Sequence, residues 1–165
     1  MRPTAIRTLD PQAGSSLSVV GDTYRIVTSG AQTAGAYAII DMLVPPGGGP
    51  GPHAHALIHE SFFVLEGEVV VRSETQTYTA RQGALVEIPT GGAVHSFRNE
   101  SSTLAHLLCI VVPAGLDDFF AEIGQPVAAG QFLPAPALNP ADLQKLQAVA
   151  AQHGQEVFPP DYLTK

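Results

Sequence analysis

Residues 47–67 read GGGPGPHAHALIHESFFVLEG and hold His53, His55 and Glu60 in one short span. His53 and His55 are two residues apart, so in an extended strand their side chains point to the same face. In a helix the same spacing would turn them about 200° apart, and they could not share one ion. The Pro/Gly-rich run at 45–52 excludes a helix directly before them. We therefore expect a strand with a metal-binding face.

A second stretch, residues 83–99 (GALVEIPTGGAVHSFRN), brings a third histidine, His95. Glu60 lies just before the apolar, strand-like run 62–65, so the alternation of side chains places it on one face with Phe62. If the two stretches meet, three imidazoles and one carboxylate form a set of borderline ligands. Such a set suits one divalent transition metal per chain (Fe, Mn, Ni, Cu, Co or Zn) rather than calcium or magnesium.

The two stretches resemble the two sequence motifs of the cupin family, and the matching residues are Gly47, His53, His55, Glu60 and Gly67, then Gly83, Pro89, Gly91, His95 and Asn99. The resemblance is to single-barrel bacterial cupins of the quercetin dioxygenase kind. It implies an all-β fold, a small antiparallel jelly-roll barrel, that assembles as a homodimer. It also implies that the four metal ligands are His53, His55, Glu60 and His95.

The remaining sequence divides the chain into three parts of one domain. Residues 1–16 are expected to form an N-terminal arm, and turn-separated apolar runs predict the strands of the barrel over 17–112. The last of these runs, 104–112, is apolar throughout, which predicts cover on both faces. Residues 113–165 are expected to be a helical C-terminal extension, with helices at 115–123 and 141–153 that pack outside the barrel.

Composition narrows the classes of function. The chain has 165 residues, 16 glycines, 14 prolines and a formal net charge of −7, which suits one turn-rich β-domain and argues against nucleic acid or an anionic membrane as partner. Its single cysteine, Cys109, excludes a disulfide within the chain and is expected to be a packing residue. The sequence shows no signal peptide and no uninterrupted apolar run of membrane-spanning length. We expect a cytoplasmic protein that binds a small molecule.

Five residues are candidates for the wall of a substrate pocket. Phe62 and Phe97 share inward faces with the ligands, whereas Tyr37, Met42 and His106 are weaker candidates. Alternation does not decide which face of its strand His106 occupies. His59, next to Glu60, is expected on the opposite face, towards solvent or an interface.

Three functions fit this site. As the resemblance implies, the first is a dioxygenase in which an enol or phenol oxygen binds the metal as an anion, Glu60 is the catalytic base, and dioxygen then attacks the substrate. The second is an isomerase, lyase or cyclase that uses the metal as a Lewis acid. The third is a binding or sensor protein without turnover. Residues 17–112 contain four arginines and no lysine, which favours a neutral or aromatic substrate over an acidic sugar.

Overall fold

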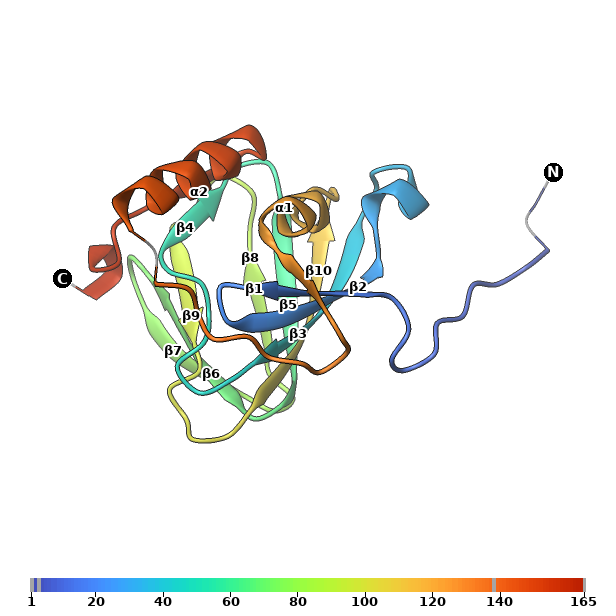
Figure 1. Ribbon diagram of the computed structural model, residues 1–165, viewed down its shortest axis with the longest axis horizontal. Coiled ribbons are helices and arrows are strands. Elements are labelled where there is room, and N and C mark those ends of the chain that lie inside the picture. The colour runs from blue at the N-terminus through green and yellow to red at the C-terminus, as the bar shows by residue number, and fades with distance from the viewer. Residues whose placement is uncertain (1, 3, 138, 165) are drawn as a thin grey trace.

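The structure, a computed structural model, describes residues 2, 4–137 and 139–164, and it consists of two antiparallel sheets that enclose one core (Figure 1). The seven-stranded sheet has the order β11 (Gln125–Val127), β1 (Ser15–Val19), β2 (Asp22–Thr28), β3 (Ala38–Val44), β10 (Ala105–Val112), β5 (His59–Glu66) and β8 (Leu85–Ile88). The five-stranded sheet has the order β12 (Gln155–Val157), β4 (His53–His55), β9 (His95–Arg98), β6 (Glu68–Ser73) and β7 (Thr77–Arg81). This is the predicted jelly-roll barrel.

Alternation of side chains divides each central strand into an inner and an outer face. On β10 the buried residues are Ala105, Leu107, Cys109 and Val111, and they join the core with Phe62 and Val64 of β5. On the outer face, Ile110 and Val112 are 39% and 48% exposed. The cover predicted for both faces of this strand is therefore absent from the described part of the chain, because the barrel core packs on the inner face only.

The Gly-rich loop before β4 is held between two strands. Gly49 has a φ of +117°, a conformation that favours glycine, and a Cβ at this position would collide with the carbonyl oxygen of Phe97 on β9. The buried carboxylate of Asp22 accepts a hydrogen bond of 3.2 Å from the Gly49 amide. The loop therefore delivers His53 to the barrel at a fixed place.

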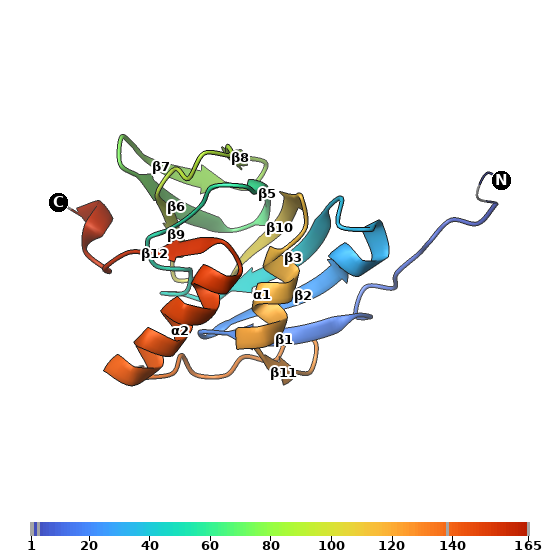
Figure 2. The same ribbon diagram turned by 90° about the horizontal axis from the view of Figure 1, so that it is seen from above.

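The C-terminal extension does more than the sequence predicts. The two predicted helices are present as α1 (Leu116–Ile123) and α2 (Pro140–Gln152), and both lie on one side of the barrel (Figure 2). The Asn139 side chain caps α2 by accepting hydrogen bonds from the amides of Ala141 and Asp142. Between and after the helices, β11 pairs with β1 and β12 pairs with β4, so the extension adds one edge strand to each sheet. Three-residue strands give no periodicity of their own, which is why they were not predicted.

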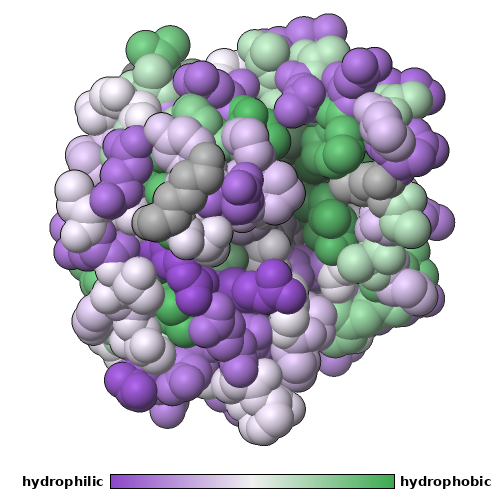
Figure 3. All heavy atoms as spheres, turned by 90° about the vertical axis from the view of Figure 1, so that its left-hand side faces the viewer, coloured by the Kyte–Doolittle hydropathy of each residue, from purple (hydrophilic) through white to green (hydrophobic). Residues whose placement is uncertain are grey.

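The two ends of the chain differ in their contacts. The N-terminal arm points away from the body at its start (Figure 1), and Arg7 then hydrogen-bonds Thr28 and Val27 of β2. Strand β1 begins at Ser15, two residues before the predicted boundary. Two short 3-10 helices, η1 (Gly30–Thr33) and η2 (Tyr162–Thr164), complete the described elements. On η2, Tyr162 donates a hydrogen bond of 2.8 Å to Glu74. The face of the molecule near the C-terminus is hollowed at its centre and carries both hydrophilic and hydrophobic side chains (Figure 3). Met1 and Pro3 of the predicted arm, and Leu138 and Lys165 of the predicted C-terminal extension, lie outside the described residues.

Candidate metal centre

The four predicted ligands meet inside the barrel, and both sheets contribute. His53 and His55 share one face of β4, and His95 on β9 is the direct register partner of His53. Glu60 reaches them from β5 in the opposite sheet. One potential ligand atom from each residue lies within 4.8 Å of all the others. The prediction that His53, His55, Glu60 and His95 come together is therefore matched by the geometry.

The cluster is compact and largely withdrawn from solvent. The Nε2 atom of His55 lies 2.9 Å from Oε2 of Glu60, and Nε2 of His95 lies 3.5 Å from the same oxygen. His55, Glu60 and His95 are each less than 5% exposed, whereas His53 is half-buried. The cluster therefore opens towards its surroundings at the His53 side.

Each imidazole is oriented by a backbone carbonyl, and this orientation fixes its free nitrogen. The Nδ1 atoms of His53, His55 and His95 lie 2.9, 3.0 and 2.9 Å from the carbonyl oxygens of Gly51, Ile58 and Ala93. Because a carbonyl only accepts, each Nδ1 carries a proton and donates it. In the neutral rings the Nε2 lone pairs then point into the cluster, which is the arrangement of a metal-ligating histidine with an outer hydrogen bond.

The donor set fits a bound cation. A carboxylate oxygen and an Nε2 lone pair repel each other unless a proton or a metal ion lies between them. The Nε2 atom of His95 is buried and has no hydrogen-bond partner among the described residues, although Glu60 lies near it. One divalent ion would satisfy this nitrogen and the carboxylate together, so the residues present fit a transition metal.

The electrostatics of the cluster follow from burial and from its own charges. Burial alone would raise the pKa of Glu60, but the hydrogen bond with His55 and the interactions with His95 and His53 outweigh it and hold that pKa well below its usual range. Burial and the neighbouring His95 lower the pKa of His53 to about 4. For His55, burial lowers the pKa, but the hydrogen bond and charge of Glu60 outweigh it and leave that pKa raised. The carboxylate is thus ionised in the neutral range.

Cys109 contacts the cluster, which the sequence analysis did not predict. Its thiol lies 3.3 Å from Oε1 of Glu60, the carboxylate oxygen that faces away from the histidines. Burial and the charge of Glu60 raise the pKa of this thiol, so it is a donor rather than a thiolate. The alternation of β10 was the available signal, because it places Cys109 on the inner face. It is fully buried, as expected of a packing residue, but it also supports Glu60.

The five pocket candidates divide between the two sides of the barrel wall. Phe62 and Phe97 are buried with ring centroids 5.3 Å apart, and Met42 belongs to the same core. Tyr37 precedes β3 and is 41% exposed, so it does not reach the interior. The prediction that His106 lines the pocket is also wrong, because β10 turns this side chain to the outer face, where it contacts Asp41. His59 lies on the outer side as expected, 3.6 Å from Glu87.

The arginines of the barrel lie away from the cluster. Arg25 pairs with Asp41, Arg72 with Glu100 and Arg81 with Glu68, and Arg98 is exposed.

None of the helices in the described ranges is long and apolar enough to cross a membrane.

Comparison with known proteins agrees with this geometry. Residues 40–111 match the cupin domain family. Quercetin 2,3-dioxygenase of Bacillus subtilis (strain 168) is 26% identical over 118 residues, which cover 72% of this chain and 34% of that enzyme. The chain thus spans about a third of the length of this relative.

Solved structures add a likeness of fold. A predicted oxalate decarboxylase from Thermotoga maritima superposes with a TM-score of 0.55 at 20% identity, covering 61% of this chain and 92% of that chain. The Cnp3 cupin domain of Schizosaccharomyces pombe gives 0.52 at 16% identity, with 66% and 76% covered. A cupin sugar phosphate isomerase from Silicibacter pomeroyi gives 0.51 at 19% identity, with 58% and 61% covered. The two-sheet barrel, the His/Glu cluster inside it and the matched domain show together that residues 40–111 of this chain form a cupin domain.

Proposed function

We propose that this protein is a metal-dependent dioxygenase that acts on an aromatic or enolisable small molecule, with one divalent transition metal held by His53, His55, Glu60 and His95. The observation that carries the proposal is the buried His/Glu cluster with its three inward-facing Nε2 atoms. The likeness to a quercetin 2,3-dioxygenase, distant as it is, supports the same class of reaction.

The charge of the site favours an anionic oxygen. Three neutral imidazoles and one carboxylate leave a divalent ion with a net positive charge, in surroundings of low dielectric constant. When bound, the metal supplies Lewis acidity and a place for dioxygen chemistry. An enol or phenol substrate would thus be held as its anion.

The residues of the chain supply the other requirements. Glu60 is the catalytic base of this proposal, because its Oε2 faces the histidines and so lies where the enol or phenol oxygen would bind. Cys109 holds the other oxygen, Oε1, and so keeps the carboxylate oriented. Phe62 and Phe97 form apolar walls in the core that help to exclude water.

Two other functions are compatible with the same cluster. A non-oxidative isomerase, lyase or cyclase would use the metal to polarise a carbonyl and would consume no oxygen. A binding or sensor protein would hold its ligand at the metal without turnover. Oxygen consumption separates both from the dioxygenase.

The first experiment is metal analysis by elemental mass spectrometry, on the wild type and on the double variant His53→Ala/His95→Ala. We expect about one transition-metal ion per wild-type chain and none in the folded double variant. Oxygen uptake by the loaded protein is then measured with quercetin and simpler enolisable aromatics. A loaded protein that binds these compounds but consumes no oxygen would contradict the dioxygenase and favour the other two functions.

The outer face of the seven-stranded sheet supports the homodimer that the resemblance implies. Exposed apolar side chains gather there on three neighbouring strands, and they are Phe63, Leu65, Leu85, Ile110 and Val112. A patch of this kind is typical of an interface. Light scattering should give the mass of a dimer for the wild type and of a monomer for Ile110→Glu. A monomeric wild type at micromolar concentration would contradict the dimer.

A further inference from the structure

We propose that Gln155 is a specificity-determining residue whose side-chain amide donates a hydrogen bond to the small molecule held at the metal centre. This inference rests on the proposed function in one respect, namely that a ligand binds at the His/Glu cluster.

The register of the edge strand places Gln155 beside the cluster. Strand β12 pairs with β4 so that Gln155 lies opposite His55 and Val157 lies opposite His53. Directly opposed residues of an antiparallel pair share one face of the sheet, with Cβ atoms about 4.5–5.5 Å apart. Val157 packs against the core, and the intervening Glu156 is exposed. The amide of Gln155 is therefore on the inner face, next to the imidazole of His55.

The amide is buried without a partner. Gln155 is only 8% exposed, and its Nε2 atom has no hydrogen bond to any residue that the structure describes. Within the same described ranges one other buried side-chain nitrogen or oxygen is in this state, and it is Nε2 of the ligand His95. Folded proteins satisfy nearly all buried donors because an unsatisfied one is costly. The two unsatisfied atoms lie in one sheet, on the two strands β12 and β9 that flank β4, and a ligand on the metal would satisfy the amide.

The surrounding contacts hold the start of β12 in place. Gly154, with a φ of +70°, forms the turn from α2 into β12. Nε2 of His153, at the end of α2, lies 2.7 Å from a carboxylate oxygen of Glu122 on α1, which ties this turn to the helix that packs on the core. Gln155 also lies outside the matched cupin domain, which ends at residue 111. The C-terminal extension therefore brings its own polar group to a site that the barrel builds.

The chemistry of the two groups defines the class of ligand. The metal centre favours an anionic oxygen, and the amide favours a second acceptor oxygen nearby. The ligand that fits is a small molecule with two neighbouring oxygens, one of them anionic, such as an enolate next to a carbonyl. A ligand that binds through nitrogen alone would not gain from the amide.

The test uses full-length protein loaded with cobalt(II), whose visible spectrum reports on ligand binding. Acetohydroxamate, which has two neighbouring oxygens, is the probe, and azide is the comparison ligand. We expect Gln155→Met, which keeps the length of the side chain, to weaken acetohydroxamate binding about tenfold while it leaves the affinities for azide and cobalt unchanged. Glu156→Met, the exposed neighbour on β12, is the matched control and should change none of them.

Three outcomes would overturn the inference. Equal affinity of the wild type and Gln155→Met for acetohydroxamate would show that the amide makes no contact with the ligand. Equal losses for acetohydroxamate and azide would show a structural role only. If Gln155→Met does not fold, Gln155→Glu is measured instead. This variant replaces the donor by an acceptor, so its affinity for acetohydroxamate should fall by more than tenfold, and the same two results would contradict the inference. A wild type that takes up no cobalt would overturn the proposed function itself, and this inference with it.

Discussion

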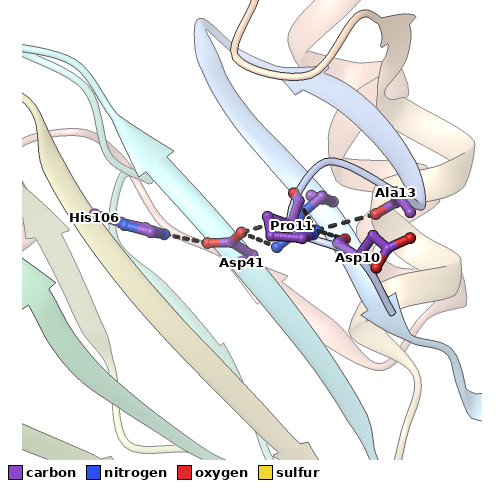
Figure 4. Close-up of polar contacts among 6 residues, drawn as sticks. Asp10, Pro11, Ala13, Asp41 and His106 are labelled. Atoms are coloured by element: carbon purple, nitrogen blue, oxygen red, sulfur yellow. Dashed lines mark hydrogen bonds and ion pairs between the residues drawn. The ribbon is translucent and has the colours of Figure 1, made fainter. Parts of the chain in front are cut away.

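The inside of the barrel and the outer face of its seven-stranded sheet both bring histidine and carboxylate together, but with different results. Inside, Glu60 faces three histidines. Outside, Asp41 contacts His106 (Figure 4) and also accepts hydrogen bonds from Arg25. The guanidinium of Arg25 is a permanent cation 2.6 Å from Asp41, so the outer cluster is neutralised by the chain itself. The inner cluster holds no such cation among the described residues, so it must take up a proton or a metal.

The outer cluster has a structural role that its hydrogen bonds reveal. Arg25 donates through Nε and Nη2 to Asp41, and through Nη1 to the carbonyl oxygens of Asp10, Pro11 and Ala13, the last at 3.1 Å (Figure 4). One side chain thus fixes the end of the N-terminal arm to the sheet. Both clusters contain histidine, so histidine does not distinguish them. The difference is the permanent charge of Arg25, which makes the outer cluster a structural contact, whereas the inner cluster is suited to a metal ion.

The largest expected effect is the loss of metal from variants of the inner cluster. His55→Ala removes one of four ligands and leaves Glu60 without its closest partner, so we expect metal affinity to fall on the order of 100-fold or more. His106→Ala is the matched control, because it removes an imidazole from the opposite face of the wall. Elemental analysis after dialysis against a weak chelator distinguishes the two. Equal metal loss in both variants would break the distinction between the faces.

A second interior carboxylate sharpens the comparison, because it has only neutral partners. Asp22 accepts hydrogen bonds from the hydroxyl of Tyr24 and the amide of Gly49, and burial outweighs both and raises its pKa from 3.8 to about 7. The folded protein therefore keeps a proton on Asp22 between about pH 4 and 7, where the unfolded chain has lost it. The free energy of unfolding should fall as the pH rises through this window, by about 4 kcal/mol at most.

Asp22→Asn removes this titration and keeps the size of the side chain. The difference in unfolding free energy between the variant and the wild type should therefore move in favour of the variant from pH 4 to pH 8. Urea denaturation of both proteins at several pH values measures it. If this difference in unfolding free energy stays constant from pH 4 to pH 8, Asp22 is ionised in the folded protein. Burial would then not be sufficient to keep a carboxyl group protonated in this barrel.

The outer cluster predicts a smaller effect that leaves the metal in place. Asp41→Ala removes the partner of Arg25 and His106, and hydrogen bonds to charged groups are each worth roughly 1.5–3 kcal/mol when partly buried. We expect a loss of about 2 kcal/mol in urea denaturation, faster tryptic cleavage of the arm at Arg7, and unchanged metal content. The control is Glu100→Ala, which breaks the more exposed pair with Arg72 and should cost less than about 1 kcal/mol. Equal costs would show that Asp41 does not clamp the arm.

Most of the barrel and the meeting of the four cluster residues could be predicted because their signals are local. His53 and His55 at a spacing of two define a strand face, and the positions of Glu60 and His95 in the motifs supply the rest. His106 could not be placed, since an apolar strand alternates without showing which side is the core. Gln155 was missed for another reason. Its strand, β12, has only three residues and forms because it pairs with β4. In that pairing Gln155 lies opposite His55, which is 100 residues earlier in the chain, so no local sequence pattern predicts the strand.

The smallest expected effect concerns His106 itself. It is partly exposed and shares Asp41 with Arg25, so His106→Gln should cost less than about 1 kcal/mol, because an amide can still donate to the carboxylate and Arg25 still neutralises it. The unfolding midpoint in urea measures this cost, and metal content and oxygen uptake should both be unchanged. A fall in either would mean that His106 communicates with the interior through β10, where Cys109 contacts Glu60 three residues further along the strand. The two faces of the wall would then act as one site, and the fixed cation on the outside would tune the metal on the inside.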